Sequence, residues 1–339
     1  MDNTVVVTGG GTGGHLSVAK SFIEEFYNRG YKVIFIGSAI GQDKQWFENE
    51  PKLYQKYFLD TKGVVNQNIL GKFHSLFLIF KAVVKSRSIL KKYNVSKVIS
   101  VGGFSAASAS FAARITDTDF YIHEQNSVVG RLNKISSKWS KELFSSYLNS
   151  SKIKDYPIDQ KYFGKSRVRE NVNTIIFLGG SQGATAINNF ALKVAPKLKE
   201  LNINIIHQTG KNDFVKIKQK YEELDIEVDV FDFSTNLLEK MDKADFAVSR
   251  AGASTLWELV ALGIPTLFIP YPYAAANHQY FNAKYLLENK LCFLKKEEDL
   301  EEDYLLNSIN KDIKDISTKL IGSIKKDAVK NIIDIITKR

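Results

Sequence analysis

Short apolar runs alternate with longer segments of helical periodicity along the whole chain. In the first half, this pattern predicts strands at 4–8, 32–37, 98–101, 120–123 and 142–145, and helices at 14–29, 73–93, 106–115 and 130–138. In the second half, it predicts strands at 174–178, 204–208, 227–230, 246–249 and 266–269, and helices at 184–199, 213–223, 237–242, 254–262 and 278–288. Strands separated by helices are typical of parallel sheets with helices on both faces, so the sequence predicts an α/β protein.

The two halves repeat this pattern, and a length of 339 residues favours two domains. We expect the linker between 150 and 171, where Pro157 and Gly164 interrupt a stretch rich in lysine and aspartate. The last stretch, 311–339, has helical periodicity. A single cysteine, Cys292, excludes an internal disulfide. No run reaches the roughly 18 to 20 apolar residues of a membrane span.

Glycine-rich loops follow the first expected strand of each half. Residues 9–15 read Gly-Gly-Gly-Thr-Gly-Gly-His, and residues 179–184 read Gly-Gly-Ser-Gln-Gly-Ala. Glycine lets the backbone turn tightly and approach a ligand, and the free amides at a helix start attract anions. Each loop is therefore expected to bind phosphate groups or to anchor an acceptor, and because ligands of parallel sheets bind beyond the carboxyl ends of the strands, both are expected to face one ligand site.

The first loop also fits a G-x-G-x-x-G pattern through Gly9, Gly11 and Gly14. A dinucleotide site requires an acidic residue at the end of the second strand, where it binds the ribose hydroxyls. That strand ends at Ser38, and the nearest acid, Asp43, comes late. This spacing disfavours a nicotinamide-dependent oxidoreductase.

Polar residues gather where other strands end. His15 is a candidate general base or sugar ligand, or a helix-start histidine satisfied by the backbone. The run His-Glu-Gln-Asn at 123–126 is a site edge or a polar capping loop. In 249–258, small hydroxyl residues open a helix and can cradle a diphosphate, with Glu258 one turn on to accept ribose hydroxyls. The alternative is an ordinary helix cap with Glu258 favouring the dipole. Gln279 and Asn282 share a helix face, and two amides suit sugar hydroxyls.

Charge is uneven along the chain, whose net charge is +10. No Asp or Glu occurs from Thr61 to Thr116, which indicates a polyanionic partner, either nucleic acid or an anionic membrane. The segment from Lys72 to Lys92 carries an apolar stripe flanked by lysines. It is either a core helix with solvated lysines or a helix whose apolar side chains enter a bilayer. The triplet 117–119, Asp-Thr-Asp, lies at the wrong end of the sheet for a metal site, and we assign it to a turn.

Five motifs together resemble those of the MurG family of peptidoglycan glycosyltransferases. They are GGTGGH at 10–15, HEQN at 123–126, GGSQGA at 179–184, the run 250–258 and NHQ-x-x-NA at 277–283, and they occur in the family's order over nearly the whole chain. The resemblance implies a GT-B fold, with two Rossmann-like doubly wound domains facing each other across a cleft. It implies an acceptor- and membrane-facing domain at 1–160, a UDP-sugar-binding domain at 165–317, and a C-terminal helix at 318–339 packed back on the first domain.

The implied reaction is the inverting transfer of N-acetylglucosamine from UDP-GlcNAc to the muramyl 4-hydroxyl of lipid I, giving lipid II. No cofactor and no metal are expected. His15 is the expected base. The expected substrate-binding residues are Thr12, Gly13, Gly14, Asn126, Ser181, Ser234, Ala253, Ser254, Thr255, Leu256, Trp257, Glu258, Gln279 and Asn282. Ser181 is assigned to the diphosphate, Ser234 to the uracil, and Gln279 and Asn282 to the sugar.

The chain departs from the family pattern in the linker, where Asp159 stands at the position of a donor-binding arginine, and Arg167 or Arg169 is the candidate substitute. The expected location is peripheral, on the cytoplasmic face of the bacterial membrane, through the segment from Lys72 to Lys92. No nucleic-acid partner is expected. Two alternatives are a UDP-sugar epimerase of the same architecture, which needs no basic apolar helix, and a non-catalytic polyanion-binding protein, which leaves the glycine loops without a purpose.

Overall fold

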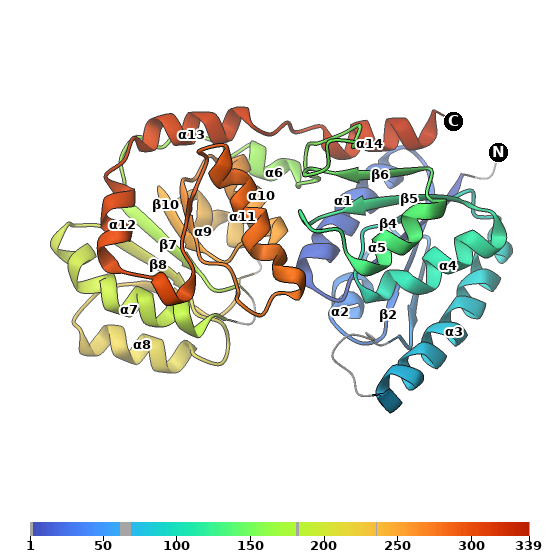
Figure 1. The fold of residues 1–339 in the computed structure, drawn as a ribbon, viewed down its shortest axis with the longest axis horizontal. Coiled ribbons are helices and arrows are strands. Elements are labelled where there is room, and N and C mark those ends of the chain that lie inside the picture. Colours follow the sequence, from blue (N-terminus) through green and yellow to red (C-terminus); the bar gives the residue numbers. More distant parts are fainter. Residues whose placement is uncertain (1–2, 62–68, 181–182, 235, 339) are drawn as a thin grey trace. The chain divides into compact units, whose positions relative to one another are not determined.

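Two parallel β-sheets organise the protein in the computed structural model (Figure 1), which describes residues 3–61, 69–180, 183–234 and 236–338. The chain divides into two units, one formed by Met1–Asp159 with Lys326–Arg339 and the other by Gln160–Lys325. Each unit contains a six-stranded sheet with parallel strands throughout. The predicted α/β class with two Rossmann-like domains is therefore confirmed.

The sheet of the first unit has the strand order β3-β2-β1-β4-β5-β6. Its strands are β1 (Thr4–Thr8), β2 (Lys32–Ser38), β3 (Gln55–Leu59), β4 (Lys97–Ser100), β5 (Asp119–Glu124) and β6 (Glu142–Ser145). Its helices are α1 (Gly13–Asn28), α2 (Asp43–Phe47), α3 (Ile69–Lys92), η1 (Phe104–Ala106), α4 (Ala107–Thr116), α5 (Arg131–Ser136), η2 (Ser137–Trp139) and α14 (Ala328–Thr337). Strand β1 is buried at every position, as expected for a central parallel strand covered on both faces.

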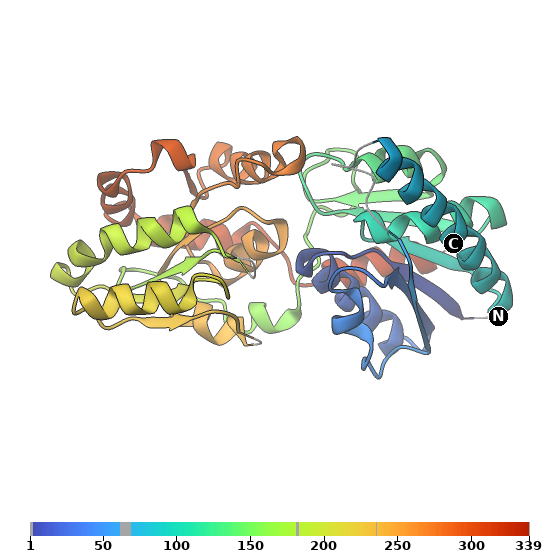
Figure 2. The same cartoon turned by 90° about the horizontal axis from the view of Figure 1, so that it is seen from below.

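One core of this unit lies between the sheet and the helices α3 and α4, which run side by side in Figures 1 and 2. Val6, Ile34 and Val98 from the sheet meet Ala109 and Leu90 from the helices. The small side chains of α4 let it pack closely on α3 and on β4 and β5. This packing fixes the strands whose carboxyl ends carry the loops described below.

The C-terminal segment differs from the prediction of one helix at 318–339. It forms two helices, α13 (Ile313–Gly322), which belongs to the second unit, and α14, which belongs to the first. Helix α14 packs on α1, where Arg29 forms an ion pair of 2.7 Å with Asp334 and donates to the Lys330 carbonyl at 3.0 Å. The second unit therefore extends to Lys325 rather than to 317.

The sheet of the second unit has the strand order β12-β11-β10-β7-β8-β9. Its strands are β7 (Thr174–Leu178), β8 (Asn204–Gln208), β9 (Asp229–Phe231), β10 (Phe246–Ser249), β11 (Thr266–Phe268) and β12 (Phe293–Leu294). Its helices are α6 (Gln160–Phe163), α7 (Thr185–Glu200), α8 (Phe214–Glu223), α9 (Leu237–Asp242), α10 (Ala253–Leu262), η3 (Ala275–Asn277), α11 (His278–Glu288), η4 (Glu297–Asp299), α12 (Glu302–Ile309) and α13.

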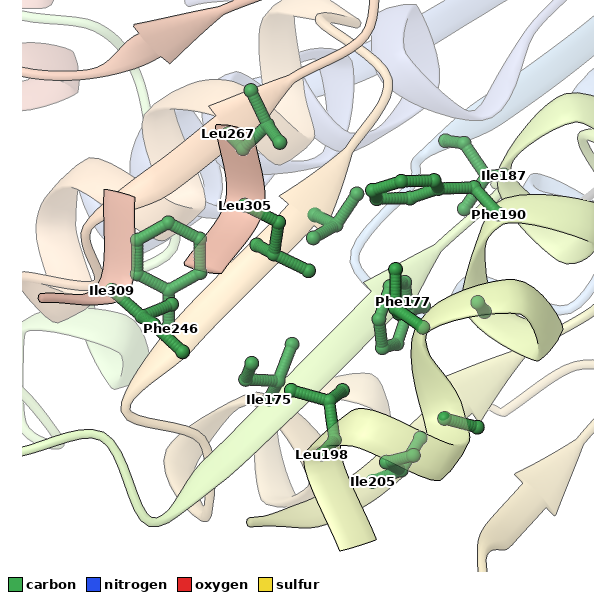
Figure 3. Packing of buried hydrophobic residues seen from close by; sticks show 14 of the residues in the cluster. Ile175, Phe177, Ile187, Phe190, Leu198, Ile205, Phe246, Leu267, Leu305 and Ile309 are labelled. Atoms are coloured by element: carbon green, nitrogen blue, oxygen red, sulfur yellow. The ribbon is translucent and has the colours of Figure 1, made fainter. Parts of the chain in front are cut away.

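Figure 3 shows the core of the second unit. Ile175 and Phe177 of β7 meet Phe190 and Leu198 of α7, and Phe246 of β10 meets Ile309 of α12 in the same cluster. Helices α7 and α8 lie side by side in both overall views. Because β7 is central and its helix α7 is well anchored, the loop between them has a rigid support at both ends.

Candidate functional site

Three loops of the first unit meet at the carboxyl ends of β1, β4 and β5. The amide of Gly10 donates to the carbonyl of Gly102 at 3.1 Å, which joins the loops after β1 and β4. Gly103 has φ +80°, and a Cβ there would collide with the carbonyl oxygen of Gly10. The predicted glycine loop therefore depends on a second glycine pair for its close backbone contact.

Asp43 holds the first glycine loop from within. Its carboxylate accepts from the amide of Gly11 at 2.5 Å and from the amide of Ser38 at 2.8 Å, and its side chain is fully buried. Burial raises the pKa of Asp43, while the hydrogen bonds from Ser38 and Gly11 act in the opposite direction. The amide of Gly11 is thus committed to the protein's own carboxylate. This role agrees with the expectation that Asp43 is not the ribose-binding acid of a dinucleotide site.

We expect Asp43→Asn to lower stability by about 1–3 kcal/mol, because one amide hydrogen would then face the NH₂ group of asparagine instead of an acceptor. Urea denaturation measures this loss. Asp60→Asn, at an exposed carboxylate of the same unit, is the control and should leave stability unchanged. Equal stability of both variants would show that the carboxylate does not hold the loop.

His15 lies in the first turn of α1 and is half-buried. Its Nδ1 lies 2.9 Å from the hydroxyl of Thr12, the N-cap residue of the helix. A Cβ built on Gly102 would lie 3.4 Å from His15 Nε2 and 3.3 Å from Asn133 Nδ2. The imidazole and the Asn133 amide therefore flank the same glycine, on the loop side of the sheet.

Glu124 fixes the loop that carries Asn126. Its carboxylate accepts from the amides of Asn126 and Gly130, both at 2.9 Å, and from Asn133 Nδ2 at 2.8 Å. The side chain is almost fully buried. Glu124 belongs to the polar run 123–126 that was predicted as a site edge or a capping loop, but Asn133 was missed, because its contact with Glu124 depends on the return of the chain in α5.

The other residues of the His-Glu-Gln-Asn motif face the interior. His123 is buried between the rings of Phe22 and Tyr156, with centroid distances of 6.1 and 5.6 Å. Burial, with a smaller contribution from the charge of His15, lowers the pKa of His123 to about 3, so this ring is neutral. Gln125 donates to the carbonyl of Val101 at 3.1 Å. The motif is therefore mainly a support for Asn126.

In the second unit, the loops after β7 and β10 lie next to each other in the sheet order. Gly180 and Gly183 adopt φ of +79° and +78°, and Ser181 lies outside the described residues. Helix α10 begins at Ala253 after the N-cap Gly252, with Ser254, Thr255 and Glu258 half-buried. Leu256 and Trp257 are buried, so their side chains belong to the core. Their expected part in substrate binding is therefore limited to their backbone groups.

The two amides of α11 differ in exposure. Gln279 Oε1 accepts from the amide of Tyr271 at 3.0 Å, which directs its NH₂ group away from that contact. Asn282 is fully buried and donates to the carbonyl of Ala251 at 3.2 Å. Asn282 therefore supports the loop before α10. Ser234 is half-buried, and its hydroxyl accepts from the amide of Asn236 at 3.1 Å.

Three arginines brace the second unit. Arg250 donates to the carbonyls of Ile269 and Pro270 at 3.0 and 3.2 Å and pairs with Glu297. Arg167 pairs with Asp245 at 3.1 Å. Arg169 is fully buried; it donates to the carbonyls of Ala244, Arg167 and Leu262, the last residue of α10. Burial lowers the pKa of Arg169 to about 10, which leaves it charged at neutral pH. Both candidate substitutes for the linker arginine are thus engaged inside the second unit.

Comparison with known proteins gives this architecture a family. The glycosyltransferase family 28 N-terminal domain matches residues 5–145, and the family 28 C-terminal domain matches residues 174–336. A protein of Sulfurovum sp. (strain NBC37-1) is 48% identical over 98% of this chain and 98% of its own length. A protein of Campylobacter jejuni is 49% identical over 97% of this chain and 96% of its own. Both are named UDP-N-acetylglucosamine--N-acetylmuramyl-(pentapeptide) pyrophosphoryl-undecaprenol N-acetylglucosamine transferase.

Solved structures agree with this match. The crystal structure of Acinetobacter baumannii MurG has a TM-score of 0.80 and 25% identity, with 99% of each chain covered. A UDP-GlcNAc 2-epimerase of Neisseria meningitidis has a TM-score of 0.67 at 12% identity, with 99% of this chain and 100% of that chain covered, which shows a shared fold alone. The matches to both domains and to full-length relatives decide between these families, and the chain belongs to glycosyltransferase family 28 and, within it, to the MurG family.

Proposed function

We infer that this protein transfers N-acetylglucosamine from UDP-GlcNAc to the muramyl 4-hydroxyl of lipid I, with inversion, and so forms lipid II for peptidoglycan synthesis. The observation that carries this inference is the identity of 48–49% over nearly the full length with relatives named for that reaction. The second unit supplies the donor site and the first unit the acceptor site in this proposal.

The donor diphosphate is assigned to the amides at the start of α10, Ala253 to Thr255, and to the loop 179–184 with Ser181. These N–H groups and the helix dipole favour a negative charge, which grows on UDP as it departs. Glu258, one turn further along α10, accepts the ribose hydroxyls, and the backbone at Ser234 binds the uracil. The free NH₂ group of Gln279 donates to the sugar, while Asn282 holds the carbonyl of Ala251.

His15 is assigned as the base, and Thr12, Gly13, Gly14 and Asn126 are assigned as the residues of the first unit that close on the donor. When His15 Nδ1–H donates to Thr12 Oγ1, Nε2 carries the lone pair that accepts a proton. The acceptor oxygen then forms a bond to the anomeric carbon as the bond from that carbon to the UDP oxygen breaks. The hydroxyl proton moves to Nε2, and UDP leaves with the electron pair.

The direct test is UDP release from UDP-GlcNAc with and without a short-chain lipid I analogue. We expect release only when the analogue is present. Conversion of UDP-GlcNAc without an acceptor to its 2-epimer would instead favour the epimerase, whose fold this chain shares. RNA binding without affinity for UDP-GlcNAc would favour the non-catalytic alternative.

Helix α3 is the proposed membrane contact. Leu76, Phe77, Phe80 and Val84 are each more than half exposed and lie along one stripe of the helix, while Leu90 and Val83 face the core. Exposed basic side chains follow the stripe at Lys81, Lys85, Arg87, Lys91 and Lys92. The side chain of Lys72 lies outside the described residues. Such a pattern fits the surface of an anionic bilayer, where each cation contributes about 1 kcal/mol. In the described ranges, no helix is long and apolar enough to cross a membrane.

We expect the pair Phe77→Ser and Phe80→Ser to reduce sedimentation with anionic vesicles several-fold without unfolding the protein, because these rings are 54% and 65% exposed. Val215→Ser, at a residue 75% exposed on α8, is the matched control and should sediment like the wild type. Unchanged sedimentation of the double variant, or equal binding to neutral vesicles, would rule out α3 as the contact.

A further inference from the structure

A buried chain of hydrogen bonds runs beneath the second glycine loop, and neither the predicted site nor the proposed mechanism uses it. His207 of β8 is fully buried, with Nδ1 2.9 Å from the hydroxyl of Tyr221 and Nε2 3.0 Å from Asn188 Oδ1. Asn188 Nδ2 donates to the carbonyl of Thr209 at 3.1 Å and to Asp213 at 2.9 Å. The chain of bonds therefore joins β8 to the starts of α7 and α8.

The donor and acceptor in each of these hydrogen bonds follow from the two acceptors that Asn188 Nδ2 faces. Asn188 Nδ2 faces two acceptors, a carbonyl and a carboxylate, so the amide nitrogen and oxygen are fixed and Oδ1 must accept. His207 Nε2 then carries the proton and donates to Asn188, and Nδ1 accepts from the hydroxyl of Tyr221. Burial lowers the pKa of His207 to about 3 and raises that of Tyr221, so both groups are neutral and this single arrangement persists at physiological pH.

This series of hydrogen bonds ends at the carbonyl oxygen of Thr209, which lies next to Gly183. A Cβ on Gly183 would lie 2.5 Å from the carbonyl oxygen of Thr209, the same oxygen that Asn188 holds. The amide of Gly179 donates to the carbonyl of Gln208 at 3.3 Å, and Asn188 itself makes the first backbone bond of α7, to Ala184. Gly183 therefore lies against the Thr209 backbone, which Asn188 holds and His207 supports through Asn188.

We propose that His207 and Asn188 are positioning residues for donor binding, which hold the Thr209 backbone and, against it, Gly183 at the approach to α7, and that the affinity for the nucleoside diphosphate depends on this position. This inference rests on the proposed donor site. An apolar side chain at position 207 would fill the same space without the cost of burying a polar ring. The complete pairing of the ring with its neighbours points instead to a requirement for fixed loop geometry.

The test is calorimetric titration of UDP into the wild type, His207→Leu and His207→Gln. We expect His207→Leu to raise the Kd of UDP about tenfold, a change equivalent to the loss of one buried hydrogen bond. His207→Gln keeps an N–H donor for Asn188 and should recover most of the affinity. The KM for the acceptor should stay at the wild-type value in both variants, which a general loss of stability would not produce.

Thr266→Val is the matched control, since it removes a buried hydrogen bond of 2.9 Å to Ile264 at the amino end of β11. It should lower stability while leaving the Kd of UDP unchanged. Wild-type affinity in a folded His207→Leu would overturn the proposal. ¹⁵N NMR of the unmodified protein gives an independent result, because a proton on Nδ1 of His207 would also overturn it. A wild type that does not bind UDP would contradict the proposed function itself.

Discussion

Replacement of His15 by alanine is expected to lower kcat by about 100- to 10,000-fold, the usual contribution of a general base, while the affinity for UDP stays unchanged. The affinity for UDP should not change because the residues assigned to the diphosphate, the ribose and the uracil all belong to the second unit, whereas His15 belongs to the first. Steady-state kinetics with UDP-GlcNAc and a soluble lipid I analogue measure kcat and both KM values.

Thr12→Val is the companion variant. It keeps the imidazole but removes the hydroxyl 2.9 Å from Nδ1, so the ring loses a hydrogen-bond partner that helps to orient it. We expect a smaller fall in kcat than for His15→Ala, on the order of tenfold, from the loss of one hydrogen bond. A His15→Ala enzyme that changes only the acceptor KM would show that His15 orients the acceptor and that another group takes the proton.

Gly103→Ala is expected to cause the largest structural effect in the first unit. The methyl group would collide with the carbonyl oxygen of Gly10, and relief requires movement of the first glycine loop. The left-handed conformation adds its own cost of about 1–2 kcal/mol for a residue with a side chain. We expect a loss of more than about 2 kcal/mol in stability and of most transferase activity, with the Kd of UDP little changed.

Gly30→Ala distinguishes the cost of the steric collision from the cost of the left-handed backbone conformation. Gly30 has φ +79°, nearly the same as the +80° of Gly103, but nothing lies within 4 Å of a Cβ placed there. This variant should lose only the conformational term, about 1–2 kcal/mol, and keep its activity. Urea denaturation and the transferase assay give both quantities for each variant. Equal effects of the two substitutions would mean that the contact between Gly103 and Gly10 does not control the loop.

Central strands were predictable because each is a continuous apolar run with clear ends. Strands β1, β7, β8 and β10 lie at the predicted residues, and α9 and α11 also match. Strand β3 and helix α2 were not predicted. Strand β3 lies at the sheet edge and is only partly buried, so its residues lack a strong apolar pattern. Helix α2 is too short for its periodicity to be recognised.

The break between the two C-terminal helices is marked in the sequence by a glycine, which our prediction did not use. Gly322 is the last residue of α13, and glycine is common at helix ends, yet we expected one helix across it. The apolar periodicity resumes in α14, so periodicity alone joins the two helices. Their division between the units follows from the packing of α14 on α1, which local patterns do not encode.

In the candidate site, the sequence predicts which residues share a helix face but not which of them are buried or which distant residues they contact. Gln279 and Glu258 were predicted from their spacing, which determines the face of a helix that a residue occupies, and their roles stay predictions. Spacing does not determine which face is buried, and the structure places Asn282 fully inside. Asp43 accepts from the amide of Gly11, and His207 contacts the side chains of Asn188 and Tyr221, all of them distant in sequence. Such contacts exist only in the folded chain.

Transfer of one sugar onto a lipid-linked acceptor leaves a product whose linkage identifies the reaction. Purified protein is incubated with UDP-GlcNAc and a short-chain lipid I analogue, and the product is examined by mass spectrometry and proton NMR. We expect a disaccharide with a β linkage from N-acetylglucosamine to the muramyl 4-position, formed in equal amount to UDP. An α linkage, or the absence of any disaccharide while UDP-GlcNAc is consumed, would contradict the proposed reaction.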